Sequence, residues 1–598
     1  MTPPHTSSLE LAVIGNSRIG ALIDTRGDVV WMCVPRFDGD PVFCALLDGV
    51  EAARGRFAID IENCAAVEQD YLRNTPILRT VKRDGAGNAI EILDFAPRFY
   101  QYGRIFAPVS LVRIVRPLTG RPRIRVHFDP RCDYGAGQPQ ITWGSHHIRA
   151  QLPDYPMRLT TDASISAVVE RRFFILEREA SFIFGPDETL SQSPSEAGRH
   201  LLAETTAYWH RWVRNLAVPF EWQAAVIRAA ITLKLNAFED SGAIIAAMTT
   251  SIPEAADTVR TWDYRYCWLR DAYFVVNALN RLGATSSMER YLHYLENIVA
   301  EAGSEQLQPC YAINGTAFLE ELNMPGLAGY RGMGPVRHGN LAYLQTQHDV
   351  YGSVIVGVTH AFFDERLGRM GDEALFRQLE KLGHQAFANH DQPDAGIWEF
   401  RGRQSVHTFS SMMCWAACDR LARIAARLHL PDRQHFWAER AAHIHAVICA
   451  RAWSDAIGGF SAVFDGDIVD ASLLLMGELD FLPPDDPRLR ATIEMIERHL
   501  RRGDFLLRYA EPDDFGRPEV AFLVCSFWLV QALARIGEPD RARAHFETLL
   551  ACRNRFGLLS EDIDFDTHEL WGNFPQTYSM VGIVMCAMRL SRRWDDAF

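Results

Sequence analysis

The sequence lacks the features that would assign it to a membrane, disulfide-bonded or nucleotide-binding class. No uninterrupted apolar run approaches the roughly 18 residues of a membrane-spanning helix, and the first residues show no basic region followed by an apolar stretch. The 12 cysteines form no CxxC pair and no regular spacing, which predicts reduced core thiols. A phosphate-binding GxxxxGK(S/T) loop and a GxSxG turn are also missing. We therefore expect a cytoplasmic protein without membrane contact.

A surplus of positive charge is missing as well. The 598 residues include 75 acidic and 61 basic side chains, and the net charge of −14 argues against nucleic acid as a partner. Apolar residues make up 48% and charged residues 23%, as in globular proteins whose cores need no disulfide or metal. Length alone predicts about two to four domains of about 100–200 residues each.

Residues 9 to about 190 show the alternation of apolar and polar positions that is typical of strands. Arg123–Phe128 is one such stretch, and Asp84-Gly85 marks one of the turns. Because many short strands follow one another without a helical pattern between them, we predict an antiparallel β-sandwich over residues 1–190. After a break rich in Ser and Pro, residues 191–220 are predicted to form a linker with a helix.

The remainder of the chain is helical in pattern and repeats. An apolar helix ends, a short turn follows and a second helix begins at Arg281-Leu282-Gly283, Arg427-Leu428-His429 and Arg535-Ile536-Gly537. Some helices are apolar nearly all round, as in Phe522 to Leu533, and others are amphipathic. Such pairs predict two concentric layers, and about 380 residues at roughly 60 per hairpin give about six hairpins. We therefore predict a closed (α/α)6 toroid over residues 221–598.

Three clusters rich in tryptophan and acidic residues lie at or next to predicted helix ends. They are Trp262–Asp271, Gly396–Arg401 and the stretch from Ser560 to Gln576. Aromatic rings offer flat apolar faces to a sugar ring, Arg and Asp bind its hydroxyls, and two separated glutamates can cleave a glycosidic bond. Together the clusters predict a sugar site at one mouth of the toroid.

Glu399 and Glu561 are the candidate catalytic carboxyls. Glu399 stands between Trp398 and Phe400, which could desolvate it and keep it protonated as an acid. Glu561 lies in a polar stretch, where it should stay ionised and act as a base. An ion pair of Glu399 with one of the arginines that follow it is the plainer alternative.

Arg270 and Asp271 could bind the hydroxyls of a terminal sugar, because buried hydroxyls need partners. The alternative is a helix N-terminus, where Asp271 would complement the helix dipole, and both roles can coexist. The aromatic run from Tyr264 to Trp268 is more typical of a core than of a sugar platform. The histidines near the proposed mouth lack the spacing of metal ligands, so we expect no metal and no cofactor: they are His338, His348 and His407.

In order and type, these motifs resemble glycoside hydrolase family 15, the family of glucoamylases, glucodextranases and bacterial trehalases, over nearly the whole chain. The opening from Ile14 to Asp38 is similar to the N-terminal domain of the trehalase-like bacterial branch. The later matches are Thr249–Glu254, Trp262–Tyr266, Gly329–Gly332, Trp398-Glu399 and Gly572–Gln576. The resemblance implies a β-sandwich followed by a catalytic (α/α)6 barrel.

The resemblance also implies residue roles. Glu399 matches the general acid and Glu561 the general base of an inverting hydrolysis, which needs the carboxyls about 6.5–9.5 Å apart so that water fits. The implied substrate-binding residues are Arg270 and Asp271 at the non-reducing glucose, Trp398 and Tyr311 at the cleavage point and, from less distinctive stretches, Arg508 and Glu519. The chain departs from the family at His407 and Ser411, where an aromatic residue and a lysine are expected. This departure leaves the second sugar and its linkage undetermined.

We therefore expect an exo-acting, inverting α-glucoside hydrolase that releases β-glucose from the non-reducing end of small α-glucans or from trehalose. Its partner is a small oligosaccharide or disaccharide, and the sequence is compatible with a homo-oligomer. Two alternatives stay open. One is a glycoside phosphorylase, in which phosphate replaces water, and the other is a non-catalytic sugar-sensing or scaffold protein with a related barrel. The two matched glutamates argue against both.

Overall fold

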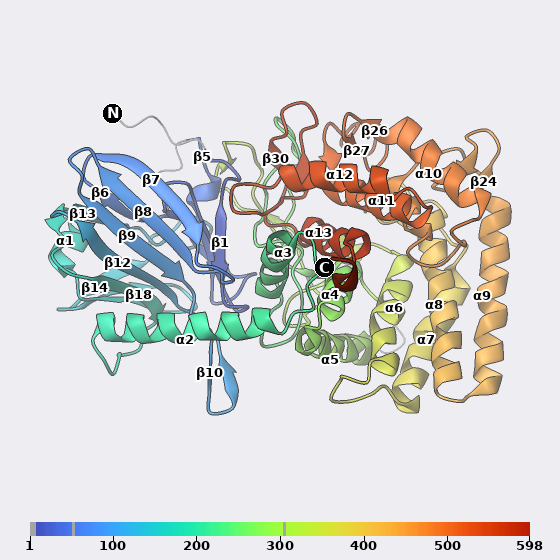
Figure 1. Ribbon diagram of the computed structural model, residues 1–598, viewed down its shortest axis with the longest axis horizontal. Helices are drawn as coiled ribbons and strands as arrows, with labels where there is room; N and C mark the ends of the chain where they lie inside the picture. Colours follow the sequence, from blue (N-terminus) through green and yellow to red (C-terminus); the bar gives the residue numbers. More distant parts are fainter. Residues whose placement is uncertain (1–6, 51–53, 303–305, 598) are drawn as a thin grey trace.

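The computed structural model describes residues 7–50, 54–302 and 306–597, which form a strand-rich and a helical region side by side (Figure 1). Strands make up the N-terminal region and helices the C-terminal one, as predicted. Between them, helix α2 (Pro194–Arg214) runs along the edge of the sheets toward the helices. The division of the chain at 190 and 220 stays a prediction.

The strands form two antiparallel sheets packed face to face. The seven-stranded sheet has the order β1-β2-β3-β6-β13-β17, with β4 paired to β3, and the eight-stranded sheet has the order β14-β15-β16-β18-β12-β9-β8-β7. The rings of Phe57 and Phe182, one from each sheet, lie 6.3 Å apart. Buried Arg113 pairs with Asp94 at 2.7 Å and donates across the core to the carbonyl of Phe57, so that its charge is compensated.

The bounds of these elements follow in chain order. The seven-stranded sheet contains β1 (Ala12–Gly15), β2 (Gly20–Ile23), β3 (Val29–Val34), β4 (Asp40–Phe43), β6 (Phe57–Ile61), β13 (Arg123–Phe128) and β17 (Phe174–Ile175). The eight-stranded sheet contains β7 (Cys64–Tyr71), β8 (Leu78–Asp84), β9 (Ala89–Phe95), β12 (Leu111–Thr119), β14 (Gln140–Trp143), β15 (His147–Gln151), β16 (Met157–Thr161) and β18 (Ala180–Pro186). Outside the sheets lie η1 (Ala45–Leu47), β5 (Asp48–Gly49), β10 (Phe99–Gln101), β11 (Arg104–Phe106) and α1 (Ile165–Val169).

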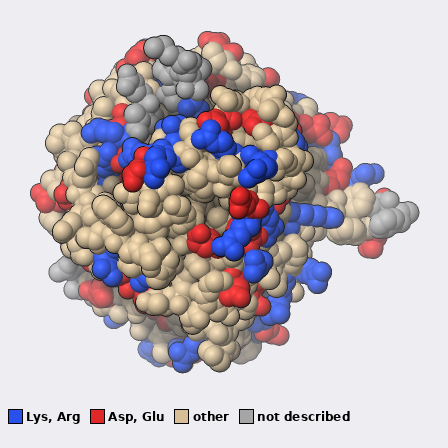
Figure 2. Space-filling model, turned by 90° about the vertical axis from the view of Figure 1, so that its left-hand side faces the viewer, with Lys and Arg blue, Asp and Glu red and all other residues tan. Residues whose placement is uncertain are grey.

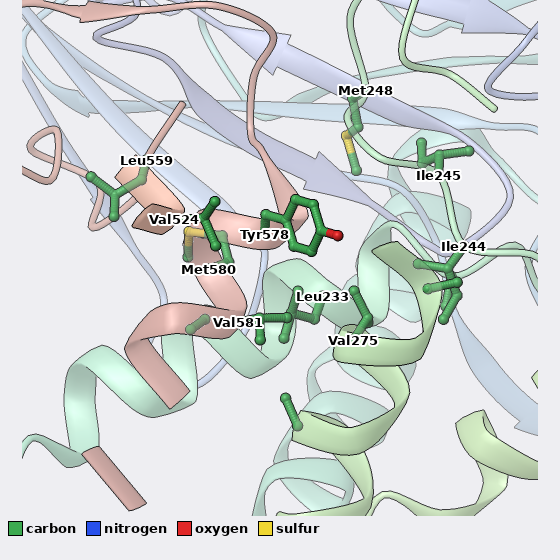
Figure 3. Packing of buried hydrophobic residues seen from close by; sticks show 14 of the residues in the cluster. Leu233, Ile244, Ile245, Met248, Val275, Val524, Leu559, Tyr578, Met580 and Val581 are labelled. Carbon is green, nitrogen blue, oxygen red and sulfur yellow. The ribbon is translucent and has the colours of Figure 1, made fainter. Parts of the chain in front are cut away.

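The inner helices of the C-terminal region contact one another in a closed order. Contacts run from α4 to α6, α8, η3, α11 and α13, and α13 returns to α4. α3, α5, α7, α9, α10 and α12 pack against these inner elements. The inner α11 is buried nearly all round, whereas the outer α12 buries one face, as the two kinds of apolar pattern predict. Figure 3 shows Leu233 of α3, Val275 of α4 and Val581 of α13 meeting in this core.

The inner elements are α4 (Leu269–Arg281), α6 (Asp349–Phe363), α8 (Thr408–Arg427), η3 (Ala471–Met476), α11 (Leu523–Arg535) and α13 (Thr577–Leu590). The outer elements are α3 (Gln223–Leu235), α5 (Thr285–Ala302), α7 (Glu373–Asn389), α9 (Pro431–Arg451), α10 (Pro487–Leu500) and α12 (Pro539–Ala551). Short strands between them include β19 (Cys267–Trp268), β20 (Cys310–Tyr311), β22 (Gly329–Tyr330), β27 (Phe505–Leu506), β28 (Ala521–Phe522), β29 (Asp562–Ile563) and β30 (Leu570–Trp571). The helix ends predicted at Arg281, Arg427 and Arg535 are confirmed.

One inner position differs from the predicted uniform helix pairs. It holds η3, a six-residue 3-10 helix, in place of a long α-helix. Asp470 caps η3 through the Ser472 amide and also accepts the Trp398 indole N–H at 2.6 Å. The start of η3 is therefore fixed by a contact to the second sequence cluster.

The two regions are joined through a strand and a buried arginine. β5 pairs in parallel with β22, and Arg265 pairs with Asp263 at 2.6 Å while donating to the Gly39 carbonyl. On the sheet end of the molecule, acidic and basic side chains are interspersed (Figure 2), so this face offers no extended basic area. All 12 cysteines are unpaired, and most of them are buried. Within the described ranges, no helix combines the length and apolarity needed to cross a bilayer.

Candidate active site

A pocket of about 900 Å³, which includes open solvent at its mouth, lies where inner helices begin. α4, α11 and α13 start beside it, after Trp268, Phe522 and Gln576. All three sequence clusters contribute to its lining, including Glu399 and Glu561. The chain therefore brings together segments that are about 300 residues apart in sequence, in the way that stacked helix pairs predict.

Glu399 lies in the loop between α7 and α8, and its side chain is 24% exposed. Its Oε1 accepts hydrogen bonds from Trp268 Nε1 at 2.7 Å and Gln347 Nε2 at 3.2 Å, and it pairs with Arg270 Nη2 at 3.4 Å. In the described structure, the hydrogen bonds of this side chain all end on Oε1. Oε2 is therefore the oxygen that is free to contact a bound molecule.

Arg270 and Asp271 lie in the first turn of α4, and both are buried in the pocket wall. Arg270 Nη1 donates to Gln347 Oε1 at 2.8 Å and to Asp349 Oδ2 at 3.1 Å. Burial raises the pKa of Asp271 to about 7, although the charge of Arg270 acts in the opposite direction. Arg270 and Asp271 therefore both begin a helix and line the pocket, the two roles that the sequence left as alternatives.

Glu561 is only 2% exposed, and it precedes β29. Burial, followed by the charge of Glu254, raises the pKa of Glu561 to about 8, while a hydrogen bond with Tyr264 and the charge of Arg508 lower it. The sequence placed Glu561 in polar surroundings, where it would stay ionised. Those polar surroundings are not found, because Glu561 and the following Asp562 are both buried and the chain becomes exposed only from Asp566 onward.

Two aromatic residues connect the carboxyls. The rings of Tyr264 and Trp268 meet edge to face at 5.5 Å, and they bond Glu561 and Glu399 respectively. Both rings line the pocket, and both also belong to or pack against a buried apolar cluster, so this aromatic run is core and pocket wall at once. Tyr266 lies in the same cluster, with its hydroxyl at the Gly339 amide.

Glu254 is a further pocket carboxyl, and sequence reasoning missed it. It accepts the Trp262 indole N–H at 2.8 Å and Arg508 Nη2 at 2.7 Å. Its position in the matched stretch Thr249–Glu254 was the signal that could have identified it. Glu254 thereby holds Arg508, a predicted binding residue, in the pocket lining.

Trp398 also lines the pocket, but Tyr311 and Glu519 do not. Tyr311 is buried on β20, where its hydroxyl accepts the Gln308 amide at 3.0 Å. β20 pairs with β19, and in this register Tyr311 lies opposite Cys267, the residue before Trp268. Glu519 is exposed at a smaller neighbouring pocket, because the loop that carries it folds outward after Phe515. The predicted direct substrate contacts of Tyr311 and Glu519 are corrected accordingly.

The residues at the two departures from the family pattern lie behind the pocket wall. Ser411 is buried in α8 and donates to the His390 carbonyl at 2.5 Å. His407 bonds Asp394 at 2.7 Å, and its ring stacks on Phe400 at 5.9 Å. Only Phe400 of these residues lines the pocket. His407 therefore contacts the pocket lining through Phe400.

The chemistry of the pocket suits a polyhydroxylated ligand. Several buried polar atoms of lining residues lack a hydrogen-bond partner: Arg270 Nε, Asp271 Oδ2, Arg508 Nε, Glu561 Oε2 and Tyr578 Oη. Such atoms are costly unless a ligand or water satisfies them. Across the described ranges, no three His, Cys, Asp or Glu side chains are grouped so as to hold a metal ion.

Comparison with known proteins agrees with both regions. The model described as Glycosyl hydrolases family 15 matches residues 222–588, and that described as Trehalase-like, N-terminal matches residues 5–171. The trehalase of Mycobacterium tuberculosis is 32% identical, covering 99% of this chain and 91% of that protein. The trehalase of Thermoplasma acidophilum is 31% identical, covering 96% and 98%. A bacterial glucoamylase complexed with acarbose shares the fold, with a TM-score of 0.68 at 14% identity over 99% of this chain and 96% of that one.

Proposed function

This chain belongs to family 15 of the glycosyl hydrolases and is a glycoside hydrolase, and from that premise we propose that it cleaves trehalose with inversion. One observation carries the proposal. Glu399 and Glu561 line the same pocket as Arg270 and Asp271, each of which has a buried polar atom without a hydrogen-bond partner. A terminal glucose held there would present its anomeric carbon to both carboxyls. We also assign residues 1–190 to a β-sandwich and 221–598 to an (α/α)6 toroid.

In the proposed reaction, two protons move at opposite faces of one sugar. Glu399 Oε2 gives its proton to the bridging oxygen as the bond from that oxygen to C1 breaks. Ionised Glu561 takes a proton from water, whose oxygen bonds to C1 from the other face. Trp268, Gln347 and Arg270 hold Glu399 through Oε1, so that Oε2 stays aimed at the substrate.

Trehalose is the proposed substrate because full-length relatives carry that activity in their names. Small α-glucans such as maltose are the second candidate. A screen of trehalose, maltose, isomaltose and maltotriose for released glucose separates them. We expect trehalose to give the highest kcat/KM. If none of the four sugars were hydrolysed, the proposal would be contradicted.

Product stereochemistry tests inversion. Inverting cleavage of α,α-trehalose releases one β-glucose from the attacked ring and one α-glucose as the leaving group, so early proton NMR spectra should show equal amounts. A retaining enzyme would release only α-glucose at first. A phosphorylase would require inorganic phosphate and form glucose 1-phosphate, so an assay with and without phosphate decides between the two enzyme classes.

Amide variants test the two carboxyls. Glu399→Gln and Glu561→Gln should each lower kcat by about 10²- to 10⁴-fold, because each removes one proton transfer. Glu547→Gln on the exposed side of α12 is the matched control and should retain activity. Circular dichroism checks folding, and near-normal turnover in either pocket variant would refute its assignment.

A further inference from the structure

A second pocket, of about 370 Å³, shares a wall with the substrate pocket. Residues that line both include Glu254, Arg260 and Arg508. The substrate pocket is lined by Glu561 and the second pocket by its neighbour Asp562. Glu561 directly precedes β29 and Asp562 begins it, so the acid pair lies where the two pockets adjoin.

Both carboxyls leave one oxygen without a partner. Glu561 is 2% and Asp562 1% exposed, and neither Glu561 Oε2 nor Asp562 Oδ2 has a hydrogen bond. A Cβ atom placed on Gly572 would lie 2.9 Å from Glu561 Oε2 and 3.0 Å from Asp562 Oδ2. The two unpartnered oxygens therefore face the same side of Gly572, where only glycine leaves room for them.

The charges around the pair do not balance it. Burial and then the charge of Glu561 raise the pKa of Asp562 well above its ordinary value. The groups that act on Glu561 are Glu254, Tyr264, Arg508 and Asp271, and those that act on Asp562 are Glu561, Glu254, Arg508 and Arg260. Arg508 is paired with Glu254 and Arg260 with Asp513, so neither arginine neutralises Glu561 or Asp562. The two carboxyls therefore favour the protonated form.

We propose that Asp562 is a proton-relay residue that clears the proton from Glu561 into the second pocket after each turnover. The inference rests on the proposed function, in which Glu561 takes a proton from water. Asp562 first releases its own proton to solvent through the second pocket, and its carboxylate then accepts the proton of Glu561. Glu399 regains a proton through the substrate pocket as the leaving sugar departs, so one proton enters and one leaves for each bond cleaved.

Asp562→Asn tests the relay, because the amide keeps the size of the side chain but cannot carry the proton. The relay acts after bond cleavage, so kcat and KM for trehalose should fall together by about tenfold while kcat/KM changes by less than about twofold. At constant pH and ionic strength, imidazole buffer should restore kcat in the variant in proportion to its concentration. Asp566→Asn, on the exposed turn after β29, is the matched control and should behave as the unmodified protein.

A second variant leaves the acid pair untouched. Ala255→Val narrows the second pocket, which Ala255 lines, and it should also lower kcat and KM together. An unchanged kcat in both variants would overturn the relay, and so would a fall in kcat/KM without rescue by imidazole, which is the behaviour of a purely structural residue. Loss of activity in Glu399→Gln and Glu561→Gln, measured alongside, shows that such a failure belongs to the relay and not to the proposed function.

Discussion

The two walls of the substrate pocket differ in how completely their carboxyls are hydrogen-bonded. On the acid wall, named for the proposed role of Glu399, Glu399 Oε1 accepts hydrogen bonds from Trp268 and Gln347 and pairs with Arg270. On the base wall, named for the proposed role of Glu561, Glu561 is buried with Oε2 unpartnered. A general acid has to be held in one orientation, whereas a base has to receive a proton from a molecule that enters later. In this pocket, a carboxylate oxygen without a hydrogen-bond partner therefore marks a position where water or substrate would bind.

The largest effect expected from this comparison is on stability. Burial raises the pKa of Glu561 from 4.5 to about 8, so the folded protein binds more protons than the unfolded chain between these values. The contribution of Glu561 to the free energy of unfolding is then fully present below pH 4.5. It is lost as the pH rises through 8, by at most roughly 5 kcal/mol. Glu561→Gln should remove this loss and raise the Tm at pH 8.5 relative to the unmodified protein, as calorimetry can measure.

The exposed Glu547→Gln serves as the control and should leave the Tm unchanged at both pH 5 and pH 8.5. Asp271, whose pKa is raised to about 7, adds a smaller loss of the same sign that remains in Glu561→Gln. If Glu561→Gln melted at the same or a lower temperature at pH 8.5, the base wall would not hold an uncompensated carboxyl.

The next effect concerns the acid wall. Trp268→Phe removes the 2.7 Å indole hydrogen bond to Glu399 and should lower kcat/KM by about 2- to 10-fold, because a hydrogen bond between neutral groups contributes about 0.5–1.5 kcal/mol. Trp453→Phe is the matched control, since that indole donates to Asp455 at the surface. Equal activity in both variants would show that the orientation of Glu399 does not depend on Trp268.

The sequence identified most of the pocket but misjudged its electrostatics. Family motifs pointed to Glu399, Glu561 and Arg270, which line one pocket because helix pairs place their loops at one mouth. Burial could not be predicted, because it depends on segments far away in sequence, such as the one that brings Glu254 against Arg508. The role of Trp268 escaped for a similar reason, since an aromatic residue beside a strand has the same local pattern in a core and in a pocket wall.

Tyr264→Phe addresses the contact between the two walls. It removes the hydrogen bond that lowers the pKa of Glu561, so we expect kcat to fall about tenfold and the acid limb of the pH profile to move upward. Because the rings of Tyr264 and Trp268 touch, the double variant should lose less than the sum of both single losses. Additive losses would mean that the two walls act independently.

The smallest effect should come from Ser411, which the family pattern had connected with the second sugar. Its hydroxyl donates to the His390 carbonyl behind the pocket wall, so Ser411→Ala should cost about 1 kcal/mol of unfolding free energy while kcat/KM for trehalose changes by less than about twofold. Denaturant unfolding and a comparison of trehalose with maltose measure both quantities. A changed preference between the two sugars would mean that α8 influences sugar selection. Phe400 would transmit this influence, because its ring lies between this helix and the pocket.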